Sequence, residues 1–80
     1  MPAYTDRWLQ LAIDQYFELP EDRRRQVDDR IADLLVAPEG PAGSYDRLSD
    51  QWTTTYGGGA GLIVYAIVPD YGRVLILRVM

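Results

Sequence analysis

Apolar residues recur at helical spacing from about residue 6 to residue 18 of the chain. Six of them form two rows in which neighbours are four positions apart: Trp8, Ala12, Tyr16, Leu9, Ile13 and Phe17. Two adjacent rows of this kind make a broad apolar stripe along one face of a helix. Thr5 stands before the stripe and is a good N-cap residue, so we expect the helix to begin directly after it.

A second apolar stripe follows the pair Leu19-Pro20, which should end the first helix. Pro20 suits the first position of the next helix, where a backbone N–H group would have no partner in any case. One face of this helix carries four apolar residues at helical spacing: Val27, Ile31, Leu34 and Leu35. The helix should end before Pro38, and since the link between the helices is very short, we expect an antiparallel hairpin.

The pattern changes from helical to extended after a connector rich in proline and glycine, residues 38–44. Three later segments have the apolar and β-branched character of strands: residues 51–56, 62–68 and 73–79. A glycine-rich hairpin loop and the turn Pro69–Gly72 separate them. We therefore expect one α+β domain over residues 1–80, in which an N-terminal antiparallel helix hairpin packs on a three-stranded antiparallel meander.

Both faces of the last two strands are apolar. One face of the middle strand carries Leu62, Val64, Ala66 and Val68, and the other carries Ile63, Tyr65 and Ile67. Two helices can cover only one face, whereas a sheet that is half open to water normally alternates apolar with polar residues. We therefore expect a second copy of the chain, or another protein, to cover the second face. The residues that we predict to contact this partner are Ile63, Tyr65, Ile67, Tyr71, Val74, Ile76 and Arg78.

Three residue types are absent from the sequence, and their absence excludes several kinds of functional site. The chain has no Cys, His or Lys, which excludes a disulfide, a thiol nucleophile, a Cys/His zinc site and a Walker-type phosphate site. We accordingly expect no metal and no cofactor. The net charge is −4 and no long basic stripe is present, so nucleic acid is not an expected partner. The longest apolar run is Leu62–Val68, too short to span a membrane, and we expect a cytoplasmic protein without a membrane partner.

Several short segments occur in an order that is typical of one protein family. They are Leu19-Pro20 between the helices, Pro38 after them, Tyr45-Asp46-Arg47-Leu48 before the sheet, Leu62-Ile63-Val64-Tyr65 after a glycine hairpin, and the aliphatic segment Arg73–Val79. This order, over roughly residues 6–79, resembles the RelE/ParE superfamily of toxins from toxin–antitoxin systems. The resemblance implies the fold of that family and its habit of binding an antitoxin.

The chain also departs from the family pattern. Members usually begin with a β-strand that pairs into the sheet, whereas this sequence is expected to enter a helix almost at once. RelE-like ribonucleases usually carry an Arg shortly before the strand Tyr, and that position is Leu62 here. The family's lysines before the sheet are missing, as is its basic segment with a Tyr after the last strand. The resemblance therefore carries over no complete catalytic set.

RNA cleavage would need positive charge for the developing phosphorane and a group that activates the 2′-hydroxyl. The candidates for these roles are Arg73, Arg78 and Tyr65. We favour a RelE/ParE-like binding module without catalytic activity, which binds an antitoxin or forms a dimer through an open sheet face. The alternatives are a ribosome-dependent mRNA interferase, which is an endoribonuclease, and a ParE-like topoisomerase poison.

Overall fold

The computed structural model describes residues 4–40 and 43–80, and the chain forms two helices and five strands within them. In chain order these are β1 (Thr5–Trp8), α1 (Gln10–Glu18), α2 (Glu21–Val36), β2 (Gly43–Asp46), β3 (Gln51–Tyr56), β4 (Gly61–Val68) and β5 (Arg73–Val79). A single 3₁₀ turn, η1 (Pro69–Tyr71), joins β4 to β5. No helix in this part of the chain is long and apolar enough to cross a membrane.

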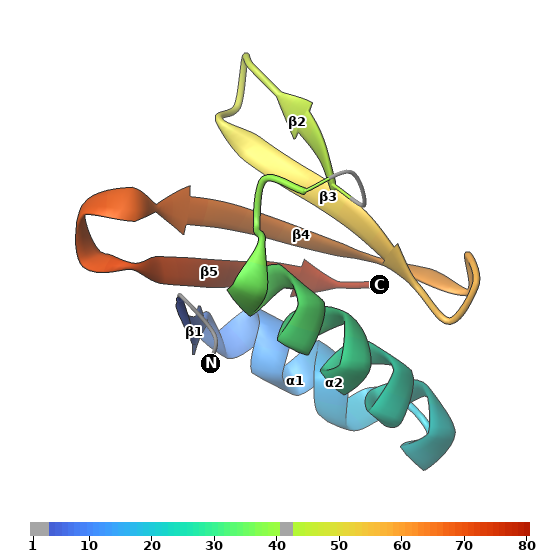
Figure 1. Cartoon of the computed structure of the whole chain (residues 1–80). Coiled ribbons are helices and arrows are strands. Elements are labelled where there is room, and N and C mark those ends of the chain that lie inside the picture. The colour runs from blue at the N-terminus through green and yellow to red at the C-terminus, as the bar shows by residue number, and fades with distance from the viewer. Residues whose placement is uncertain (1–3, 41–42) are drawn as a thin grey trace.

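The five strands form one sheet with the order β1-β5-β4-β3-β2. Strand β1 is parallel to β5, and every other neighbouring pair is antiparallel. The two helices lie together on one face of this sheet, while β2 and part of β3 extend beyond them (Figure 1). The predicted α+β class with two helices is confirmed. The predicted helix hairpin on a three-stranded antiparallel meander is wrong in detail, because the sheet is mixed and has five strands.

The first additional strand is β1, which occupies residues that the sequence pattern assigned to a helix. Thr5 is a strand residue and not an N-cap, and α1 begins only at Gln10. The N–H groups of Thr5 and Leu9 donate to the carbonyls of Gly72 and Ile76, at N···O distances of 2.9 and 3.0 Å. Without β1, the backbone groups along the outer edge of β5 would have no hydrogen-bond partners in the sheet. The pairing of β1 with the distant strand β5 therefore outweighs the local helical pattern of residues 5–8.

The second additional strand is β2, which lies in the predicted connector and in the segment after it. Residues 41–42 of that connector lie outside the described residues. Tyr45 in β2 is opposite Trp52 in β3, and their ring centroids are 5.0 Å apart. The tight turn between these strands is closed by Asp46, whose carboxylate accepts hydrogen bonds from the Leu48 N–H and the Ser49 hydroxyl. Cross-strand aromatic contact and side-chain bonds therefore stabilise a hairpin that simple alternation did not reveal.

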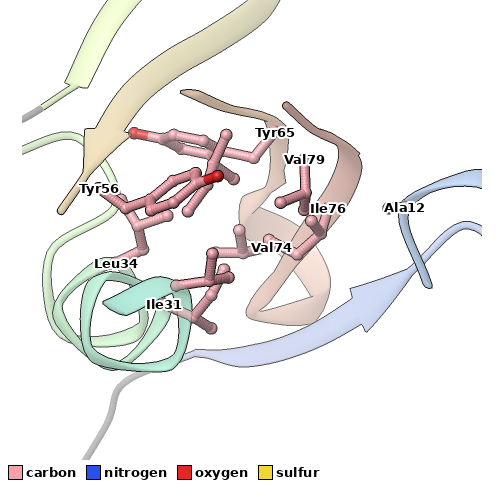
Figure 2. Close-up of a cluster of buried hydrophobic side chains, with 10 residues drawn as sticks. Ala12, Ile31, Leu34, Tyr56, Tyr65, Val74, Ile76 and Val79 are labelled. Carbon is pink, nitrogen blue, oxygen red and sulfur yellow. The ribbon is translucent and has the colours of Figure 1, made fainter. Parts of the chain in front are cut away.

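The core lies between the helices and the covered face of the sheet (Figure 2). Its fully buried members come from both helices and three strands: Ala12, Val27, Ile31, Leu34, Tyr56, Ile63, Tyr65, Val74, Ile76 and Val79. Thr54 is also buried, as expected for a residue that shares a side with Tyr56. The Tyr65 hydroxyl donates to the Pro38 carbonyl at 2.8 Å, and the Gln15 side-chain oxygen accepts from the Val79 N–H at 2.8 Å. These two bonds connect the helical layer directly to the sheet.

Candidate protein-binding face

The face of the sheet opposite the helices is the candidate site, and we call it the open face. Strand register and alternation place six apolar side chains of β4 and β5 on it: Leu62, Val64, Ala66, Val68, Leu75 and Leu77. None of the six is buried, and Leu62 is 39% exposed. No described helix packs over them, since both helices lie on the other side (Figure 1). A contiguous apolar surface therefore remains accessible in the middle of the sheet.

Three arginines border this apolar surface. Arg7 is opposite Leu75, Arg73 is opposite Val68, and Arg78 is opposite Val64, so all three share the open face. Each of the three is exposed. The register places one acidic strand residue, Asp46, on the same face, on the far edge strand, where its carboxylate accepts the bonds of the β2–β3 turn. Although the chain as a whole is acidic, the open face at β1 and β5 is therefore positively charged.

The position of Arg78 depends on an irregularity in the sheet. Pairing between β4 and β5 shifts at Val64/Tyr65, so that Val64 is opposite Arg78 while Tyr65 is opposite Ile76. The extra residue in β5, Leu77, keeps Arg78 on the open face and returns Val79 to the core. Such a bulge cannot be seen in an alternating apolar segment, since strict alternation would place Val79 on the same face as Leu75 and Leu77.

The structure corrects the predicted set of partner contacts. Ile63, Tyr65, Val74 and Ile76 are each 0% exposed under the helices, so the prediction for them selected the wrong face. Ile67 lies on the same covered face and is partly buried against the core. Tyr71 is 77% exposed in the 3₁₀ turn, and Arg78 is exposed on the open face, so these two remain accessible to a partner.

The three catalytic candidates are not brought together. Arg73 and Arg78 lie on the open face, whereas the Tyr65 ring is in the core and its hydroxyl is bonded to the Pro38 carbonyl. Burial raises the pKa of Tyr65 above its usual value of 10.0, although the charge of Arg30 acts in the opposite direction. Tyr65 is therefore a neutral, hydrogen-bonded core residue, and it is not placed to accept a proton beside the arginines.

The sequence matches no protein-family model and no curated protein. Solved structures are similar to it over nearly its whole length. The toxin–antitoxin complex RelBE2 from Mycobacterium tuberculosis includes a chain that is 26% identical, with a TM-score of 0.83 and coverage of 99% of this chain and 96% of that one.

Two further structures share the fold at lower identity. The isolated RelE toxin from E. coli is 18% identical, with a TM-score of 0.84 and coverage of 96% of this chain and 82% of that chain. The archaeal RelE–RelB complex from Pyrococcus horikoshii is 14% identical, with a TM-score of 0.73 and coverage of 96% and 92%. The N-terminal strand, whose expected absence counted against the resemblance, is present as β1. The chain therefore has the fold of the RelE toxins, and its similarity to these structures extends over nearly its whole length.

Proposed function

We propose that this chain is a toxin–antitoxin-related protein that acts as a protein-binding module. Its open face would bind an antitoxin-like segment or a second copy of the chain, and no catalytic step is required. Support comes from the similar structure from M. tuberculosis, which is the toxin–antitoxin complex RelBE2, and from the P. horikoshii structure, which is a RelE–RelB complex.

The observation that carries this proposal is the apolar surface of the open face. Its six side chains are at least partly exposed on strands whose other side packs against the helices. Burial of apolar area stabilises a complex by roughly 25 cal/mol per Å² before the entropic cost of association is subtracted. The three bordering arginines would favour a partner whose flanking residues are acidic, and would increase the rate of encounter.

The absence of a catalytic step is supported by the residues of the open face. Its described strand positions supply arginine guanidinium groups, which stabilise negative charge but do not transfer protons near neutral pH. Its remaining polar positions are threonines, Ser44, Gln51 and Asp46, and Asp46 already closes a turn. A paired acid and base, which RNA cleavage would use, is therefore not assembled by these side chains.

The proposal is tested by the mass of the purified chain in solution and by one substitution. We expect light scattering at micromolar concentration to give a mass above the 9.1 kDa of a single chain. Leu75→Glu should return the mass to that of a monomer, because a carboxylate in the middle of the apolar surface would be desolvated on association. Leu48→Glu is the matched control, since Leu48 is 95% exposed in the β2–β3 turn and away from the face. A wild-type monomer would contradict self-association.

A second candidate function is endoribonuclease activity on ribosome-bound mRNA, which the shared position of Arg73 and Arg78 favours. It predicts growth arrest when the chain alone is tightly induced in a bacterial host. The arrest should disappear in Arg78→Ala if this arginine stabilises the phosphorane. Arrest that persists in that variant would favour a topoisomerase poison, and normal growth with soluble protein present would favour the binding module.

A further inference from the structure

A second accessible site lies on the opposite side of the molecule, at the outer edge of β1. It is a groove of about 500 Å³, which we call the aromatic groove. Strand β1 and both helices line it with Asp6, Arg7, Trp8, Ile13, Tyr16, Phe17 and Asp28. This groove does not include the apolar residues of the open face, and Arg7 is the one open-face residue among those that line it.

Three aromatic rings form the walls of the aromatic groove. The centroids of Trp8 and Tyr16 are 5.3 Å apart with an interplanar angle of 75°, and those of Tyr16 and Phe17 are 5.1 Å apart at 83°. Each ring therefore stands nearly perpendicular to the next, so faces as well as edges border the space. Phe17 is 65% exposed, although burying this ring would be favourable. A ring at such exposure, beside two others, is a ready contact for a partner.

Two of the rings are hydrogen-bonded to carboxylates that line the same groove. The Trp8 indole Nε1–H donates to Asp6 Oδ2 at 2.7 Å, and the Tyr16 hydroxyl donates to Asp28 Oδ1 at 2.8 Å. Burial, followed by the hydrogen bond to Asp28, raises the pKa of Tyr16 above 10.0, so the hydroxyl keeps its proton. A donor bonded to an anion makes its ring richer in electrons, which strengthens attraction to a cation over the ring face.

The carboxylates that line the aromatic groove favour a positively charged ligand, as do the faces of its aromatic rings. Asp6 and Asp28 are exposed carboxylates with lone pairs to spare, against one guanidinium, that of Arg7. Phe17 already accepts a guanidinium on its ring, because Arg24 Cζ lies 5.9 Å from the ring centroid. Arg24 is not among the residues that line the groove, although its positive charge acts on the Tyr16 hydroxyl and partly offsets the two carboxylates.

We propose that the aromatic groove binds an arginine side chain of a protein partner. A guanidinium is flat enough to stack on an aromatic ring and carries five donors, which suit the two carboxylates that line the groove. A purely apolar side chain would leave both carboxylates facing it without a partner, at a desolvation cost. The assignment of this arginine to a protein partner rests on the proposed function, whereas binding of the guanidinium itself does not.

The chain contains a built-in reporter for this binding. It has two tryptophans, Trp8 in the groove and Trp52 on β3, and β5 and β4 lie between their strands. Each indole N–H gives its own resonance in a ¹H–¹⁵N spectrum. We would titrate the purified chain with the peptide acetyl-Gly-Arg-Gly-amide and, as a control, with the same peptide carrying neutral citrulline. We expect saturable shifts of the Trp8 signal with a Kd on the order of 1 mM at low salt, and an unmoved Trp52 signal.

Two substitutions outside the buried core test which groups of the groove bind the guanidinium. Asp28→Asn should weaken binding of the arginine peptide about tenfold, because a charge-assisted bond is lost. Phe17→Ala should weaken it about fivefold through the lost ring face. Leu48→Ala removes an exposed apolar side chain in the β2–β3 turn and should leave the Kd unchanged.

Three outcomes would overturn the proposal: no shift of the Trp8 signal, equal shifts with the citrulline peptide, or equal shifts of both tryptophans. Because the experiment uses the chain alone and a short peptide, its failure would leave the open-face proposal intact. Conversely, a monomeric wild-type protein would contradict self-association through the open face and would not affect the titration.

Discussion

The two faces of the β4–β5 pair have similar side chains and different environments. Ile63, Val74 and Ile76 are 0% exposed beneath the helices, whereas Leu62 and Leu75, which adjoin them in sequence, are accessible on the open face. Hydrophobicity therefore does not decide which residues form the core. The helices decide it, because they can cover one face only. An apolar residue in this sheet stabilises the fold on the covered face and is available for binding on the open face.

The difference between the two faces is tested most directly by a pair of neighbouring substitutions in β5. Ile76→Ala should lower the free energy of unfolding by about 2–5 kcal/mol, because it opens a cavity beneath the helices. Leu75→Ala, one residue away on the open face, should cost less than about 1 kcal/mol, because its site is already partly hydrated. Urea denaturation followed by circular dichroism would measure both. Similar losses of unfolding free energy in the two variants would mean that Leu75 on the open face is buried as well.

A smaller effect is expected in the glycine hairpin between β3 and β4. A Cβ atom at Gly61 would collide with the Tyr56 hydroxyl and with the Met80 backbone carbonyl, so Gly61→Ala should destabilise the fold by about 2–3 kcal/mol. Gly58→Ala meets no neighbouring atom and is strained only by its φ of +67°, which should cost about 1 kcal/mol. Thermal unfolding of the two variants would show whether the crowding on the covered side is the larger constraint.

The buried hydrogen bond of Tyr65 allows a test of how much polar contacts stabilise the covered face. Tyr65→Phe removes the donor to the buried Pro38 carbonyl and should cost about 1–2 kcal/mol near neutral pH. Because burial raises the pKa of Tyr65 in the folded state, its stabilisation is present below pH 10.0 and is lost as the pH rises through the higher folded-state value. The Phe variant should therefore lose less stability than the wild type between neutral and strongly alkaline pH. Equal losses in urea titrations at the two pH values would argue against this role.

The smallest effect is expected at Tyr71, outside both faces. This side chain is 77% exposed in the 3₁₀ turn, so Tyr71→Ala should change the free energy of unfolding by less than about 0.5 kcal/mol. If Tyr71 contacts a partner, as the sequence predicts, the same variant should weaken that complex in a direct binding titration. A large loss of stability would instead show that the turn contributes to the fold.

Local sequence signals located the second helix and three of the five strands. Val27, Ile31 and Leu34 recur at helical spacing, and all three are buried where α2 packs on the sheet. The strand character of residues 51–56, 62–68 and 73–79 corresponds closely to β3, β4 and β5. These signals succeed because the periods of a helix and of a strand depend on neighbouring residues alone.

Features that depend on contacts between distant parts of the chain were not predicted from the sequence. Trp8 and Tyr16 each lie four residues from Ala12 in a helical row. Trp8 nevertheless belongs to a strand, β1, which pairs with the edge of β5. The aromatic groove could not be predicted for the same reason, since its rings come from β1 and α1 and its second carboxylate from α2.

The sequence by itself predicted the α+β class, the presence of two helices and the resemblance to RelE toxins, and it shows that the chain has no Cys, His or Lys. Only the tertiary structure decided which apolar face is the core and that Tyr65 is separated from Arg73 and Arg78. It also decided that Arg78 stays on the open face through a bulge. The physical reason is that alternation assigns residues to two sides of a sheet, whereas long-range packing determines which side the helices cover.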